Sequence, residues 1–366
     1  ARGAPVIHIA RDDRRMAAMR AALGFFAPAL AVLEFPAWDT TPYDRVSPSG
    51  EIMAQRLQVL AALATGAIKP PFVVLTTMNA AIQRLPAAET VRGASFIATK
   101  GARLDEGALR GFLVRMGFSQ SPTVSEPGDY AIRGGIIDIY PPGGAGPVRL
   151  DLFGDVLDGI RQFDPETQRS LAPLDRVEIA PMSEVILDED AIARFRQSYR
   201  AEYGGGANDP LYEAVSAGQK IAGMEHWLPW FHERLDSLFD YLPGATLVLD
   251  DHLDQHREAR AHTIAEQYDA RRESLARKGG DSPYRPVAPA EMFADDAEWA
   301  RWLGRHRVIR LAVLAHPPGP GVLDAGGHVG RNFAPERQAE KADLFGTCRN
   351  RARWSSPASR KARASG

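Results

Sequence analysis

The side chains with the most distinctive chemistry lie in one short alternating segment. Its residues are Val148, Arg149, Leu150, Asp151, Leu152 and Phe153. Successive side chains of a strand point to opposite faces, so one face is apolar and the other presents a cation, an anion and a ring. Arginine and aromatic side chains are enriched where proteins bind one another. The pattern predicts a protein-binding face.

Nucleotide hydrolysis is the first enzymatic function to test. A phosphate-binding loop needs G-x-x-x-x-G-K-[ST], in which glycines bring backbone N–H groups to the phosphates and the lysine offsets their charge. Neither Gly218-Gln219-Lys220 nor Thr99-Lys100-Gly101 fits this pattern. We therefore predict that this chain neither hydrolyses nor binds a nucleotide cofactor.

Metal and nucleophile sites are predicted to be absent as well. The pair His252 and His256 has helical spacing, which we interpret as part of a solvated, charged helix. Asp250 and Asp251 end a predicted strand, where magnesium ligands can lie, but we interpret them as a helix-capping turn. No G-x-S-x-G pattern occurs. We predict no catalytic residue and no metal ligand.

Composition describes a soluble protein of two or three domains. The chain has 366 residues, 45% hydrophobic and 25% charged, without a run of 18 apolar residues. A single cysteine, Cys348, fits a reducing cytoplasm. The net charge is −2, but six basic and no acidic residues follow residue 345, which leaves the preceding residues at −8. Such an acidic body is a poor candidate for binding nucleic acid through bulk charge.

Strand-like and helix-like patterns alternate along residues 1–118 and return over residues 194–312. Strands are predicted over 6–10, 30–35, 71–76, 94–98, 247–250 and 309–314, and helices over 12–26, 48–65, 79–84, 105–116, 189–203, 209–217 and 253–278. This alternation predicts an α/β domain with a parallel sheet. Residues 119–193, with Gly-Gly, Pro-Pro-Gly-Gly and Gly-Asp turns, predict an inserted β-rich domain.

The C-terminal part of the chain has a less regular pattern. Residues 313–345 are predicted to start a further, incomplete domain. Residues 346–366 form a basic tail that we interpret as disordered or out of frame, with a nucleic-acid-binding arm as the alternative.

Trp38 and Tyr43 are expected to anchor a turn-rich loop. A cluster of aromatic residues is expected to pack in the core: Trp227, Trp230, Phe231, Phe239 and Tyr241.

Four segments give the chain a family resemblance: FPAWDTTPYDRVSPS, YAIRGGIIDIYPPG, RLDLFGDVLDGIRQFDPETQRS and GMEHWLPWF. Over residues 1 to about 345 they resemble, in order and spacing, the N-terminal part of the bacterial transcription-repair coupling factors, the Mfd family. The resemblance implies a degenerate RecA/helicase-like parallel-sheet domain split by an inserted β-rich domain, as in domains 1a, 2 and 1b of UvrB. It ends after Leu344, which suggests a truncated or frameshifted C-terminus.

In that family the inserted domain binds UvrA and recruits nucleotide-excision repair to a stalled RNA polymerase. The family's UvrA-contacting residues fall on Arg133, Arg149 and Phe153 of this sequence, with Asp151, Arg161 and Gln162 expected at the rim. Contacts with RNA polymerase and double-stranded DNA, and the use of ATP and Mg²⁺, belong to other domains of the family. The resemblance implies a cytoplasmic protein that binds no membrane, and we expect a monomer.

Three questions stay open at this level. A two-residue loop at Gly154-Asp155 would place Arg149 opposite Ile160, and a three-residue loop would place it opposite Arg161. A UvrB-like ATP-dependent helicase subunit is the alternative function. In the intact family protein the UvrA-binding face is also expected to be masked by an intramolecular contact.

Overall fold

The computed structural model describes residues 3–142, 146–204, 209–276, 284–314, 316–324 and 326. The chain divides into two compact units, residues 1–312 and 313–366, and every described helix and strand lies in the first. The predicted basic tail, and most of the predicted incomplete domain, lie outside the described residues. No helix among the described residues is long and apolar enough to cross a membrane.

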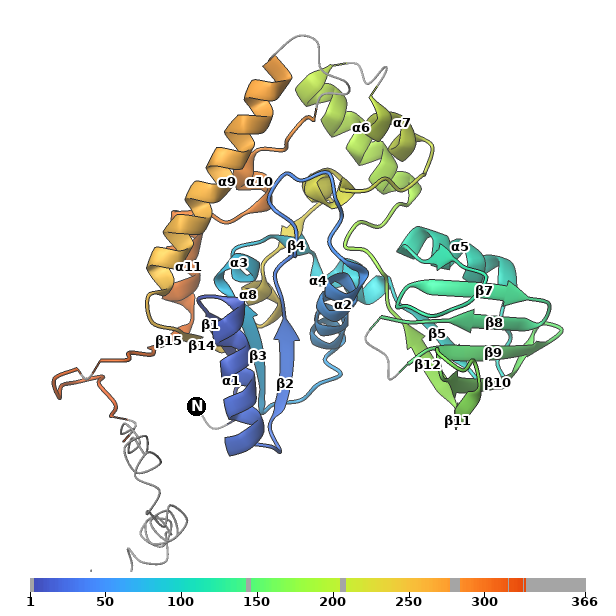
Figure 1. Cartoon of the computed structure of the whole chain (residues 1–366), viewed down its shortest axis with the longest axis horizontal. Helices are drawn as coiled ribbons and strands as arrows, with labels where there is room; N and C mark the ends of the chain where they lie inside the picture. The colour runs from blue at the N-terminus through green and yellow to red at the C-terminus, as the bar shows by residue number, and fades with distance from the viewer. Residues whose placement is uncertain are drawn as a thin grey trace, which may run out of the picture. The chain divides into compact units, whose positions relative to one another are not determined.

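A five-stranded parallel sheet forms the centre of the first unit, in the order β15-β14-β1-β3-β2 (Figure 1). Its strands are β1 Val6–Ala10, β2 Ala31–Phe35, β3 Phe72–Thr77, β14 Thr246–Leu249 and β15 Arg307–Arg310. All neighbouring pairs run parallel. Parallel sheets are covered on both faces, which explains why the central strands read as continuous apolar runs. The fold is mixed α/β with a β-rich insertion, as predicted.

Helices cover both faces of this sheet. Helix α1 (Asp13–Phe26) packs Met16 against Val73 and Leu75 on one face. Helix α2 (Gly50–Thr65) packs Val59 and Leu60 into the large core on the other face. The remaining helices that follow the insertion are α6 Glu189–Tyr203, α7 Pro210–Ser216, α8 Leu238–Tyr241, α9 Leu253–Ala276, α10 Pro289–Met292 and α11 Asp296–Arg305.

Short elements connect these parts. They are α3 Met78–Ala81, β4 Leu85–Pro86, α4 Ala88–Gly93, the 3₁₀ helix η1 Met224–Trp230 and β13 Leu235–Asp236, which pairs with β4. The predicted aromatic core is confirmed. The aromatic side chains of η1 and α8 are buried in the large core, and so is Phe231, which follows η1. Tyr43 is 2% exposed and Trp38 packs against the same core, so both anchor their loop as expected.

The inserted part is a six-stranded sheet in the order β11-β10-β9-β8-β7-β6. Its strands are β6 Ser119–Gln120, β7 Asp129–Arg133, β8 Ile136–Ile139, β9 Val148–Phe153, β10 Val156–Phe163 and β11 Ser170–Leu174. Helix α5 (Glu106–Met116) covers one face and shares a core with it, as do β5 (Phe96–Thr99) and its antiparallel partner β12 (Arg176–Ile179).

This packing corrects three details of the sequence prediction. Strand β5 does not join the parallel sheet, because it pairs with β12 and its Ala98 packs in the core of the β-rich sheet. That core also contains Leu109 and Leu113 of α5, so the predicted boundary at residue 119 would separate α5 from the sheet it covers. The predicted boundary at 193 falls inside α6, whose Phe195 and Tyr199 pack in the large core.

A buried histidine makes the stability of this fold sensitive to acid. His226 is 3% exposed beside Trp38, at 5.5 Å between ring centroids, and burial lowers the pKa of His226 to about 4. The unfolded chain takes up this proton near pH 6.5, so the free energy of unfolding falls as the pH drops from about 6.5 toward 4. We expect His226 to account for a loss of about 2 kcal/mol at pH 5 relative to pH 8.

Urea unfolding at both pH values tests this expectation. His226→Gln should reduce the pH dependence, whereas His262→Gln, whose side chain is 74% exposed in the parent, should leave it unchanged. Equal pH dependence in the wild type and in His226→Gln would contradict the assignment.

Candidate functional site

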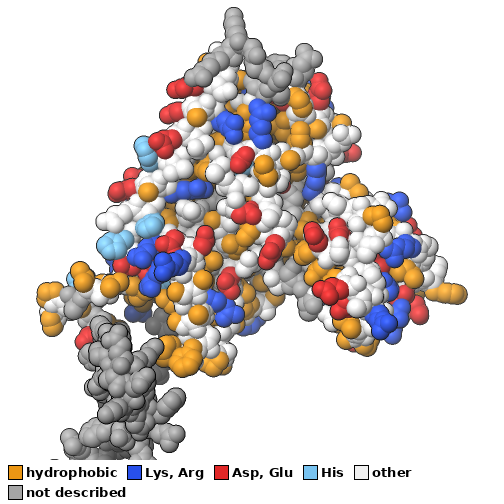
Figure 2. Space-filling view, viewed as in Figure 1, with side chains coloured by type: hydrophobic (Ala, Val, Ile, Leu, Met, Phe, Trp, Pro, Cys, Tyr) orange, Lys and Arg blue, Asp and Glu red, His pale blue; other side chains and the backbone are white. Residues whose placement is uncertain are grey.

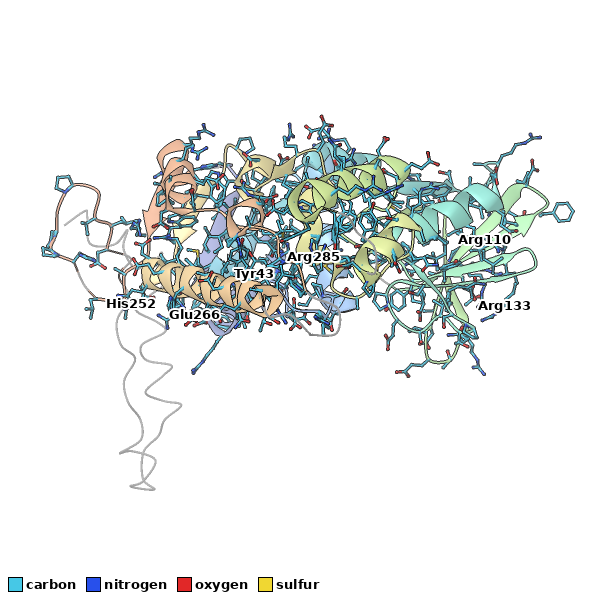
Figure 3. The ribbon with its side chains drawn as sticks, turned by 90° about the horizontal axis from the view of Figure 1, so that it is seen from above. Tyr43, Arg110, Arg133, His252, Glu266 and Arg285 are labelled. Atoms are coloured by element: carbon cyan, nitrogen blue, oxygen red, sulfur yellow. The ribbon has the colours of Figure 1, made fainter. Side chains whose placement is uncertain are left out.

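The candidate site is the face of the β-rich sheet that points away from α5, here called the outer face. Val148 and Leu150 of β9 are buried in the core with α5, and Arg149 and Asp151 alternate with them. Figure 3 shows Arg110 of α5 on one side of the sheet and Arg133 on the other. The predicted alternation of β9 is confirmed.

Strand pairing places the candidate residues in neighbouring positions. Asp151 lies opposite Ile136, Arg149 opposite Asp138, and Arg133 opposite Ile136. These pairs come from the adjacent strands β7, β8 and β9, and all point to the same face because side chains directly across a ladder share a face. Phe153 lies two residues after Asp151 on β9 and therefore shares its face. Arg133, Arg149 and Phe153 all point to the outer face.

The β9–β10 hairpin combines both predicted registers. Its loop has two residues, because Phe153 pairs directly with Val156. An irregularity between Leu157 and Gly159 then shifts the pairing by one residue, and Arg149 lies opposite Arg161. A bulge of this kind inserts one unpaired residue in a strand. Loop length alone would not have given this register.

The same pairing places Gln162, one of the predicted rim residues, away from the outer face. Gln162 lies opposite Val148, whose side chain is buried on the face with α5. Because residues directly opposite share a face, Gln162 lies on the wrong side of the sheet to accompany Arg149. The register therefore places Gln162 on the face with α5 and not on the outer face with Arg149, Asp151 and Arg161.

An apolar strip at the turn end of the outer face carries Phe153. Phe153 is 84% exposed, its partner Val156 is 37% exposed, and Ile136 on β8 is 39% exposed. Large exposed apolar side chains grouped together are typical of binding surfaces. The sequence reasoning missed Ile136 and Val156, although the position of Ile136 two residues before Asp138 on β8 would have assigned it to this face.

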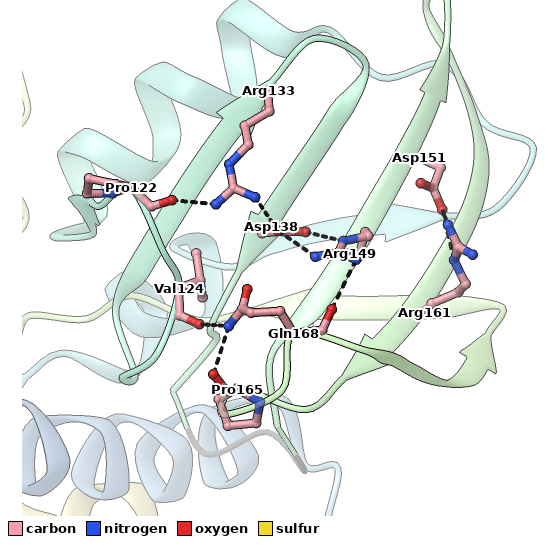
Figure 4. Close-up of polar contacts among 9 residues, drawn as sticks. All are labelled: Pro122, Val124, Arg133, Asp138, Arg149, Asp151, Arg161, Pro165 and Gln168. Atoms are coloured by element: carbon pink, nitrogen blue, oxygen red, sulfur yellow. Dashed lines mark hydrogen bonds and ion pairs between the residues drawn. The ribbon is translucent and has the colours of Figure 1, made fainter.

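Arg149 is held by partners inside the sheet. Its Nε donates to Asp138 Oδ1 at 2.7 Å and its Nη2 donates to Asp138 Oδ2 at 2.9 Å (Figure 4). The guanidinium also lies 4.8 Å from the centroid of the Phe163 ring. The hydrogen bond to Asp138 raises the pKa of Arg149 above its usual range, so the side chain remains charged. Its side chain is only 17% exposed.

Arg133 and Arg161 are the more exposed cations. The side chain of Arg133 is 51% exposed; one nitrogen donates to the Pro122 carbonyl and another lies 3.8 Å from Asp138 Oδ2. Arg161 donates two hydrogen bonds to Asp151 Oδ2, at 3.0 and 2.6 Å. Figure 2 shows basic, acidic and apolar side chains together on the surface of the β-rich part. The outer face is therefore a mixed arginine and apolar surface.

A second charged cluster occupies the carboxyl edge of the parallel sheet. Arg15 Nε donates to Asp250 Oδ2 at 3.1 Å, and Arg11 Nη1 donates to Asp251 Oδ1 at 3.2 Å. The Asp250 side chain is fully buried, and both aspartates form ion pairs beside the turn at residues 251–252, which precedes α9 where the sequence predicts a turn. Open α/β sheets bind ligands at this edge, where neighbouring connections diverge, here between β1 and β14.

Among the described residues, no three His, Cys, Asp or Glu side chains gather as metal ligands.

Comparison with known proteins gives the family. The family model of the UvrB interaction domain matches residues 97–185. The transcription-repair-coupling factor of Escherichia coli is 33% identical over 310 residues, which is 81% of this chain and 26% of that protein. The chain belongs to the transcription-repair-coupling factor family. The factor of Haemophilus influenzae is 37% identical over 235 residues, 64% of this chain and 20% of that protein.

The match covers only part of the relatives, and it includes the candidate site. The chain spans about a fifth to a quarter of the length of these relatives. The matched interaction domain begins in β5 and ends after β12, in agreement with the packing of both strands against the β-rich core. It contains every residue of the outer face described above.

Proposed function

We propose that this chain recruits UvrA to a stalled RNA polymerase in transcription-coupled repair, and that UvrA binds the outer face of the β-rich sheet. One observation carries the proposal: the matched UvrB interaction domain presents an exposed phenylalanine beside paired arginines on a single face. Aromatic and arginine side chains supply most of the binding energy at protein interfaces.

The chemistry of the outer face also describes the surface it would recognise. Phe153, Ile136 and Val156 require an apolar pocket or patch on the partner. Three arginines, Arg133, Arg149 and Arg161, are paired with two aspartates, Asp138 and Asp151, so this paired cluster carries one positive charge in excess. The matching surface on UvrA would therefore combine an apolar centre with carboxylates around it.

Co-elution on a size-exclusion column tests the proposal with the full chain. We expect the chain and UvrA to elute as one complex without added nucleotide. Separate elution of UvrA and a chain that circular dichroism shows to be folded would contradict it.

The alternative, a UvrB-like ATPase, is opposed by the ion pairs at the sheet edge. Asp250, the buried acidic residue at the end of β14, is neutralised by Arg15 instead of facing open space. A phosphate placed there would have to displace these pairs, and the sequence supplies no glycine-rich loop with a lysine to receive it. We propose that the chain does not hydrolyse ATP.

We expect phosphate release with double-stranded DNA to stay at the level of a blank reaction. The matched control is Asp250→Asn purified in the same way, which reveals contaminating activity. DNA-stimulated hydrolysis by the wild type that Asp250→Asn abolishes would establish the alternative.

A further inference from the structure

A buried carboxylate lies beneath the two arginines of the outer face. Asp138 of β8 is 1% exposed, although it carries a side chain that normally remains in water. It accepts two hydrogen bonds from Arg149 and lies 3.8 Å from a nitrogen of Arg133. Arg133 and Arg149 come from the strands on either side of β8, so Asp138 is the group they share.

The geometry of this pair fixes the direction of Arg149. A bidentate arginine–carboxylate pair sets the plane of the guanidinium as well as its distance. Here that plane lies over Phe163, and Nη1 points toward the Gln168 carbonyl at 3.5 Å. With Nε and Nη2 engaged by Asp138, Arg149 has little freedom to rotate.

The charge balance leaves the pair of arginines positive. The single carboxylate of Asp138 faces two guanidinium groups. Because this carboxylate neutralises the charge of Arg149, the charge of Arg133 is left in excess, and Arg133 is the more exposed of the two. Arg133 also donates to the Pro122 carbonyl, which ties the loop before β7 to the same cluster. Gln168 Nε2 donates to the Val124 and Pro165 carbonyls, so the two loops that flank the arginines are joined to each other (Figure 4).

We propose that Asp138 is a positioning residue for partner binding, which holds Arg133 and Arg149 side by side in the orientation the partner recognises. Binding groups need partners that fix their rotamers before the complex forms. Asp138 itself is too deeply buried to touch a partner, so it acts through the arginines. This inference rests on the proposed function, because the partner is UvrA.

Asp138→Asn in the full chain tests the inference. The amide keeps the size of the side chain but loses its charge, and its NH₂ group cannot accept a hydrogen bond from arginine. We expect the affinity for UvrA to fall at least tenfold in titration calorimetry. Wild-type affinity in folded Asp138→Asn would overturn the inference, whereas failure of the wild-type chain to bind UvrA would instead contradict the proposed function.

Double mutants separate positioning from a general structural role. If Asp138 acts through both arginines, adding Asp138→Asn to Arg133→Met should cost less affinity than adding it to the wild type, because only Arg149 is then left for Asp138 to position. Adding it to Phe153→Ala should multiply the two losses. Losses that multiply in both double mutants would overturn the inference.

If Asp138→Asn does not fold, Arg149→Lys decides the question. Lysine keeps the positive charge opposite Asp138 but cannot form the bidentate pair. We expect a severalfold loss of affinity with retained folding, and wild-type affinity in Arg149→Lys would overturn the inference.

Discussion

Phe153→Ala is expected to lower the affinity of the chain for UvrA at least about 30-fold, or about 2 kcal/mol, without changing the free energy of unfolding. The reason is the position of the ring. Phe153 is 84% exposed at the end of β9, so its removal takes nothing from the core. An exposed aromatic anchor contributes only when a partner buries it. Binding kinetics on a sensor surface should show the loss mainly as faster dissociation.

Phe25→Ala is the matched control for this variant. Phe25 is 79% exposed at the end of α1, outside the β-rich sheet. The same loss of a ring there is expected to leave UvrA binding unchanged. An equal effect of both substitutions would show that the measured loss is not specific to the outer face.

Arg149→Ala is a less suitable test, although the sequence singles out Arg149 equally. Removing this guanidinium leaves Asp138 buried without its bidentate partner. A buried charge left unpaired destabilises the fold, so the variant would mix lost stability with lost affinity. Arg133, half exposed, is the arginine whose truncation reports on the interface itself.

The second large effect concerns stability. Arg56→Ala is expected to lower the free energy of unfolding by about 3–5 kcal/mol, because it leaves the buried carboxylate of Glu184 unpaired. The side chains of Arg56 and Glu184 are both fully buried, and Arg56 Nε lies 2.6 Å from Glu184 Oε1. Arg56 also donates to the Pro36 carbonyl at 2.7 Å and lies 4.3 Å from the Phe35 ring centroid. Guanidinium unfolding followed by circular dichroism measures the difference.

A double substitution controls for the loss of volume at this site. Arg56→Met with Glu184→Leu removes both charges and restores apolar packing, so it should recover most of the stability. A loss below about 1 kcal/mol in Arg56→Ala would mean that the pair is worth no more than one on the surface.

The sequence predicts those features that depend on local pattern. Apolar runs located the strands of the parallel sheet, and alternation along β9 identified the outer face with Arg149, Asp151 and Phe153. Asp105 and Asp188, which cap α5 and α6, illustrate why helix starts are readable: the cap lies beside the first turn it stabilises.

Features that depend on distant residues could not be predicted. Strand β5 resembles its predecessors in the parallel sheet, but it pairs with β12, nearly eighty residues later. The partner of Arg56 lies 128 residues away in sequence. The bulge near Asp158 changes the face of Gln162; Gly159 beside it permits a bulge, but a glycine in a strand does not by itself fix the register. Each of these is set by tertiary packing that a local pattern does not contain.

Titration of UvrA with the full chain, followed by calorimetry, tests the central claim most directly. The outer face predicts saturable binding by the wild type at micromolar or lower concentration, retained in Phe25→Ala and strongly weakened in Phe153→Ala. No binding by a folded wild-type chain, or binding that Phe153→Ala leaves unchanged, would contradict the account.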